Sequence, residues 1–134
     1  MIPTSFLIYG QEIQVDMVAD LGRKEAALGI TRYRENLIQL QDDAPGYPIP
    51  YQQIEQTFYH ELVHVILAAM HATELNDDEN FVDTFSHLLH QAITTMEYDY
   101  DDLINDLEVD AANEDSDSDE SPDVLLTVRD GRAA

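Results

Sequence analysis

The sequence contains no cysteine, which excludes disulfide bonds and thiolate chemistry and is compatible with a reducing cytoplasm. Basic residues are scarce: Lys and Arg number 6 against 28 Asp and Glu, and the formal net charge is -22. Such a charge repels nucleic-acid phosphates and anionic membrane surfaces. The chain start lacks the features of a secretory signal, and the longest apolar run is too short to cross a bilayer. We therefore expect a cytoplasmic protein without nucleic-acid or membrane partners.

The negative charge is concentrated at one end of the chain. The 134 residues, 44% of them hydrophobic, suffice for one domain with a modest core. From Asp99 to Asp123 the sequence is dense in like charges, and the second half of this stretch has almost nothing to bury. We predict a folded domain over residues 1–100 and a disordered acidic tail over 101–134, with a short apolar patch at 124–128. The alternative for the tail is that this patch docks on a sheet edge, within the chain or on another copy, and blocks a cleft.

Apolar periodicity predicts an α+β fold. Strands are indicated at residues 5–9, 13–17, 26–30 and 37–41, and a Pro-rich loop follows at 42–50. Helical spacing then predicts one helix over about 51–70 and a second over about 78–97, with Asn76 or Asp77 as the N-cap of the second. The expected architecture is a small N-terminal antiparallel sheet of about three or four strands, packed on two or three helices.

The most hydrophobic run of the chain carries three polar residues in the order His60-Glu61-Leu62-Val63-His64. On a helix, two histidines four positions apart lie on one face, so both imidazoles can bind one metal ion. Glu61 is offset by about 100° and can reach a water molecule rather than the metal itself. This HExxH pattern combines two zinc ligands with a carboxylate that takes a proton from the activated water. The alternative is a pair of satisfied core histidines beside a surface glutamate.

A catalytic zinc usually takes a third protein ligand and leaves one position for water. Five downstream residues are candidates: His71, Glu74, Glu79, His87 and His90. We favour Glu79, because it begins a helix that must pack against the histidine helix. Asp83 follows one turn later and can accept a hydrogen bond from the second ring nitrogen of a ligating histidine. The alternatives are a capping box between Asn76 and Glu79, and a solvated position for Asp83.

Together, the segments "HELVH" and "ENFVD" resemble the HExxH…ExxxD signature of gluzincin metallopeptidases. The small size is most similar to a minimal gluzincin, such as the small metallopeptidases encoded by phages and prophages, and more distantly to SprT-like and ImmA-like domains. The resemblance implies a zincin-like fold, zinc bound by His60, His64 and Glu79, Glu61 as the general base, and Asp83 as a partner of a ligating histidine. For a phage-encoded protein it also implies the cytoplasm of a bacterial host.

These observations predict a zinc-dependent metallopeptidase that acts on a peptide or protein substrate. The strand at residues 37–41 is the expected cleft edge, on which the substrate would add as a further strand. The sequence singles out no Tyr or His for stabilising the oxyanion. Two alternatives remain: a protein with a structural zinc site, and an acidic nucleic-acid mimic that captures a basic partner through its charge.

Overall fold

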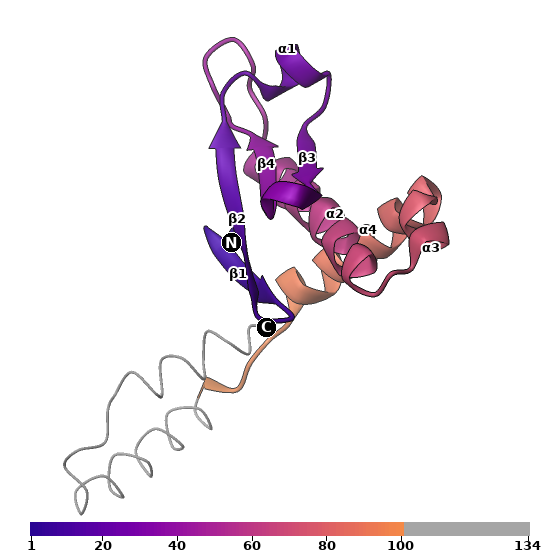
Figure 1. Ribbon diagram of the computed structural model, residues 1–134. Helices are drawn as coiled ribbons and strands as arrows, with labels where there is room; N and C mark the ends of the chain where they lie inside the picture. Colours follow the sequence, from indigo (N-terminus) through magenta and orange to yellow (C-terminus); the bar gives the residue numbers. More distant parts are fainter. Residues whose placement is uncertain (101–134) are drawn as a thin grey trace, which may run out of the picture. The chain divides into compact units, whose positions relative to one another are not determined.

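The four strands of the sheet are not arranged in their chain order. The computed structural model describes residues 1–100; the predicted acidic tail and its apolar patch lie outside the described residues. The strands β1 (Ser5–Ile8), β2 (Gln11–Val18), β3 (Gly29–Arg32) and β4 (Leu37–Gln41) form one sheet in the order β1-β2-β4-β3. Figure 1 shows this sheet beside the helices of the same unit, Met1–Met96.

The predicted α+β class is confirmed, but the expectation of an antiparallel sheet is wrong. β1 and β3 pair with their neighbours antiparallel, whereas β2 and β4 run parallel. The cause is the route of the chain after β2. It passes through α1 (Leu21–Glu25) to the sheet edge, forms β3, and returns through the 3-10 helix η1 (Tyr33–Glu35). β4 therefore enters between β3 and β2 in the direction of β2, and the sheet is mixed.

Because of this topology, the strand at this edge of the sheet is β3 and not the predicted strand, β4. β4, which was predicted to form the cleft edge, lies in the interior of the sheet, and its residues Ile38 and Leu40 are fully buried. A strand with neighbours on both sides has no free backbone groups for a further strand. Within the described sheet, β3 is the edge strand on this side.

The helix α2 (Tyr51–Ala69) lies between the sheet and α4 (Glu79–Thr95). Apolar residues of α2 therefore pack against the sheet on one side and against α4 on the other. The main core contains residues of β2, β4, the loop before α2, and α2 itself: Ile13, Val15, Ile38, Leu40, Ile49, Ile54, Phe58, Tyr59 and Val65. A smaller cluster joins α2 to α4 through Val63, Leu67 and Val82.

The bounds of α2 and α4 confirm the two predicted helices within one or two residues at each end.

The connection between these helices is more ordered than a loop. α2 and its C-cap residue Met70 are followed by a left-handed residue, His71, with φ 57°, and the Ala72 N–H donates to the Leu67 carbonyl at 2.9 Å. This is the hydrogen bond of a Schellman motif, which satisfies a terminal carbonyl and turns the chain sharply. The short helix α3 (Thr73–Asp77) follows directly.

The start of α4 differs from the prediction. The N-cap is Asp78, whose carboxylate accepts a hydrogen bond from the Phe81 N–H at 3.1 Å. Asn76 and Asp77 were expected to cap this helix, but both belong to α3. Glu79 is therefore the first residue of α4, where a carboxylate also interacts favourably with the helix dipole.

Candidate metal centre

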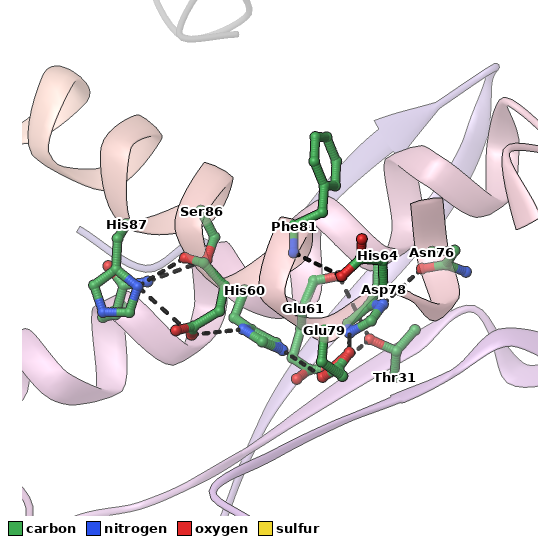
Figure 2. Close-up of polar contacts among 12 residues, drawn as sticks. Thr31, His60, Glu61, His64, Asn76, Asp78, Glu79, Phe81, Ser86 and His87 are labelled. Carbon is green, nitrogen blue, oxygen red and sulfur yellow. Dashed lines mark hydrogen bonds and ion pairs between the residues drawn. The ribbon is translucent and has the colours of Figure 1, made fainter. Parts of the chain in front are cut away.

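Three side chains predicted as zinc ligands meet at one point between α2 and α4. His60 Nε2 lies 3.4 Å from one carboxylate oxygen of Glu79, and His64 Nε2 lies 3.1 Å from the other. The ligand atoms of His60, His64 and Glu79 all lie within 4.8 Å of one another. Figure 2 shows the two imidazoles and the carboxylate pointing toward each other. The sequence expectation that these side chains converge therefore agrees with the geometry.

The chemistry and spacing of this donor set suit zinc. Zn²⁺ binds imidazole nitrogen at about 2.0–2.1 Å, and a tetrahedral ion therefore separates two of its ligand atoms by about 3.3 Å. The two contacts of Glu79, 3.4 Å and 3.1 Å, are close to that separation. Two histidines and one carboxylate are also a ligand set found in catalytic zinc sites, where a further coordination position stays open.

Each histidine has a second partner on the side away from Glu79. Asp83 Oδ1 lies 3.5 Å from His60 Nδ1, and Asn76 Oδ1 lies 2.6 Å from His64 Nδ1. Because an amide oxygen can only accept, the contact with Asn76 needs a proton on Nδ1 of His64, and in that tautomer Nε2 would be the nitrogen that binds a metal. Asp83 was expected beside a ligating histidine, and the structure places it beside His60.

Sequence reasoning missed Asn76. Its position before α4 suggested a helix cap, and nothing in the local pattern points to His64, twelve residues earlier. The contact depends on the sharp turn at His71, which folds α3 back along α2. A ring partner for the second histidine could have been expected from zinc chemistry, but its identity could not.

Glu61 is nearly buried, with 7% of its surface exposed, and its carboxylate faces the edge strand. The Thr31 hydroxyl donates to Glu61 Oε1 at 2.6 Å. The backbone of β3 approaches closely here: a Cβ on Gly29 would lie 2.5 Å from Thr57 Cγ2 and 3.1 Å from Glu61 Cγ. β3 thus fixes the orientation of the predicted general base. Neither Gly29 nor Thr31 carried a sequence signal for this role.

Tyr33 adds a hydroxyl near the histidines. The Asn76 amide donates to the Tyr33 hydroxyl oxygen at 3.3 Å. Burial raises the pKa of Tyr33, the contact with Asn76 lowers it, and the negative charges of Glu61 and Glu79 raise it again, with a net increase. The phenol therefore stays protonated at neutral pH and is available as a hydrogen-bond donor.

Of the three candidate ligands, His60 lines a hollow of about 420 Å³ between α2, α4 and the start of β3. Its lining consists of Leu28, Gly29, Gln53, Gln56, Thr57, His60, Glu61, Asp83 and His87. His60 and Glu61 thus share one open space with the edge strand. A side chain that acts on a bound molecule must border such a space, whereas a side chain enclosed in the core cannot reach a ligand.

The remaining candidate ligands do not join the metal group. His71 and Glu74 are exposed. His87 Nδ1 lies 2.8 Å from the Asp83 carbonyl oxygen. His90 pairs with the buried Glu55 at 2.9 Å and is not part of the candidate metal group.

The basic residues near the start of the chain make local contacts. Arg23 lies 3.1 Å from Asp20, Lys24 lies 3.9 Å from the same carboxylate, and Arg32 lies 2.9 Å from Glu25. These pairs are partly or largely exposed and contribute little stability.

Across residues 1–100, no helix is both long and apolar enough to cross a membrane. Comparisons of the chain with protein-family models, with curated proteins and with solved structures find no match. The resemblance to gluzincins therefore depends on the motif residues and their geometry alone.

Proposed function

We propose that this protein is a zinc-dependent peptidase that hydrolyses peptide bonds with Glu61 as general base. The observation that carries the proposal is the convergence of His60, His64 and Glu79, together with the hollow that Glu61 lines beside His60. A metal site without hydrolytic activity needs ligands, but it does not need a carboxylate that stands next to the ligands and opens to the same space. The proposed location is the cytoplasm, in agreement with the absence of cysteine.

Several residues of the chain have separate roles in the proposed reaction. When bound, zinc supplies Lewis-acid polarisation of the carbonyl and lowers the pKa of water toward neutrality. Glu61 takes the proton from the attacking water and passes it to the leaving amine. Thr31 holds one oxygen of this carboxylate, so the other is directed to the reactants. Tyr33, whose hydroxyl contacts the same Asn76 that contacts His64, is our candidate for donating a hydrogen bond to the developing oxyanion.

The substrate backbone has a candidate binding strand in β3. The predicted strand, β4, is enclosed by its neighbours, whereas β3 borders the hollow through Gly29 and contacts Glu61 through Thr31. An extended peptide that pairs with the free edge of β3 would pass Glu61 and the metal ligands. Backbone pairing of this kind provides affinity with little sequence preference.

Metal analysis and hydrolysis, measured on the same variants, test the proposal. The full chain should bind one zinc per molecule, and His60→Ala should lose it. Glu61→Gln should retain the metal and lose hydrolysis of a peptide library by a factor of at least about 10². Hydrolysis that persists at the wild-type rate in Glu61→Gln would contradict the role of Glu61, and a metal-free wild type purified in excess zinc would contradict the site.

A further inference from the structure

The helix α4 carries an apolar stripe on its outer surface. Phe85 and Leu88 are 46% and 62% exposed, and the Phe81 ring stacks on Phe85 with the ring centroids 5.7 Å apart. Phe81, Phe85, Leu88 and the exposed Ala92 recur at intervals of four, three and four residues. Residues at this spacing line one side of a helix, here over about 16 Å. We call these four residues the α4 seam. Figure 2 shows the Phe81 side chain pointing away from the two histidines.

The surroundings of the α4 seam carry no fixed charge. Residues 84–95 include no Asp, Glu, Lys or Arg, although the chain has 28 acidic residues. The acidic side chains of α4 and its N-cap, Asp78, Glu79 and Asp83, all lie near the start of the helix. A basic partner would require acidic groups beside the stripe, and an anionic membrane surface would require Lys or Arg there. The surface that fits the α4 seam is therefore itself apolar and uncharged.

A second copy of the chain supplies such a surface, because the α4 seam is complementary to itself. In an antiparallel pair of α4 helices, Phe81 faces Ala92 of the second copy, and Phe85 faces Leu88. Each layer then combines a larger side chain with a smaller one, which fills the space between two helices. The acidic helix starts lie at opposite ends of such a pair, whereas a parallel pair would place like charges side by side.

We infer that two copies of this chain associate through their α4 seams as an antiparallel helix pair with twofold symmetry. The inference does not depend on the proposed peptidase function, since Glu79 lies roughly 150° around the helix from the middle of the seam. A contact limited to one helix is small, so we expect a Kd on the order of 10–100 μM. Each copy has a net charge of -22, and salt should strengthen the pair because it screens this repulsion.

Sedimentation equilibrium of the full chain at rising concentration, in about 0.1 M and about 0.5 M salt, tests the inference. The mass should rise from that of one chain toward that of two, and more so at the higher salt concentration. Leu88→Glu places a carboxylate in the seam of each copy and should raise Kd by at least about 100-fold. Leu88 is largely exposed, so the variant should keep the circular dichroism spectrum of the wild type.

The matched control is Thr94→Glu. Thr94 is exposed, and helical spacing places it on the side of α4 opposite to the seam. The substitution changes the net charge by the same amount and should leave Kd within about threefold of the wild-type value. Equal weakening in both variants would show that overall charge controls association and would overturn the inference.

A mixing experiment tests the antiparallel arrangement. Phe85→Lys alone should be monomeric, as should Leu88→Glu alone. An equimolar mixture of the two should dimerise, because the introduced Lys and Glu face each other only in the antiparallel pair. A mixture that stays monomeric overturns the inference. A wild type that stays monomeric at about 1 mM in both salt concentrations also overturns it, and leaves the apolar residues 124–128 of the same chain as the alternative occupant of the seam.

Discussion

The single residues around the candidate metal group determine how the two imidazoles are oriented. His60 and His64 each contact Glu79 with one ring nitrogen and an oxygen acceptor with the other. Partners of this kind fix the tautomer and the ring plane, so that the free lone pair points to the metal.

Asn76→Ala should weaken zinc binding by about 10- to 100-fold, the usual effect of removing such a partner. The reason is the loss of the 2.6 Å contact that orients His64. Competition with a chelator of known affinity measures the change. Asn80→Ala is the matched control, because Asn80 is exposed in the first turn of α4 and is not one of the three candidate ligands. Equal zinc affinities of the two variants would refute the role of Asn76.

Thr31→Val should keep zinc and lower hydrolysis by about tenfold. The substitution nearly preserves the shape of the side chain but removes the hydroxyl that donates to the Glu61 carboxylate. Thr31→Ser, which retains the hydroxyl, should recover most of the rate. Steady-state kinetics and metal content of the three proteins provide the measurement. A Thr31→Val enzyme with the wild-type rate would mean that Glu61 is oriented by other contacts.

At the scale of elements, the site depends on the fit between β3 and α2. Gly29 allows the strand backbone to approach Thr57 and Glu61 at distances that a Cβ atom would not tolerate. The edge strand of the sheet therefore contacts the proposed general base, Glu61, directly through Thr31.

Gly29→Ala should reduce both stability, by about 1–3 kcal/mol, and hydrolysis, because the added methyl overlaps Thr57 Cγ2. Urea unfolding and peptide hydrolysis measure the two effects. A second change, Thr57→Ser, removes that methyl and keeps the hydroxyl that donates to the Gln53 carbonyl at 2.8 Å. The double variant should regain stability relative to Gly29→Ala alone. A single variant as stable and active as the wild type would show that the elements shift apart easily.

The elements also show what could be read from the sequence. The long helices and the strand at 37–41 have strong periodicity, and their positions were predicted closely. The five-residue helix α1 was not predicted, because a single turn has little intrinsic signal. The parallel pairing of β2 with β4 was missed as well, since strand partners are chosen by tertiary packing rather than by local pattern. The proximity of His60, His64 and Glu79 could be predicted from motif spacing, whereas the contacts of Thr31 and Asn76 could not, because their partners are distant in sequence.

For the whole molecule, the main core and the metal group consist of different residues. The core lies between the sheet and α2 and includes none of the three ligands. Metal is therefore expected to add stability by binding the native state, without being required for folding.

Treatment with a chelator should lower Tm by several degrees while the unfolding transition stays cooperative and the circular dichroism spectrum changes little. Calorimetry of the metal-free and zinc-loaded protein provides the comparison. His60→Ala should melt like the metal-free wild type and should not respond to zinc. Global unfolding on metal removal would instead support the structural-zinc alternative.

A buried ionic contact should make stability depend on pH. Burial raises the pKa of Glu55, but the contacts with the Met1 ammonium and with His90 lower it more, so the net direction is downward. The folded protein then binds fewer protons than the unfolded chain, and this contribution is present at neutral pH and lost as the pH falls through the folded pKa. Urea midpoints at several pH values, in chelator, should show that Glu55→Gln loses part of the acid dependence of the wild type. Parallel pH profiles for the two proteins would contradict this.

The separation in sequence between the ion-binding residues and the strand that orients the base has a consequence for newly made chains. His60 and Glu79 belong to one helical hairpin, whereas Thr31 lies 30 positions from Glu61 and reaches it only after the sheet has docked. Contacts between near neighbours form faster than those between distant segments. A nascent or partly folded chain is thus expected to capture its ion before its base is aligned. The proposed hydrolysis is then expected to begin later than ion binding, once β3 has docked on α2.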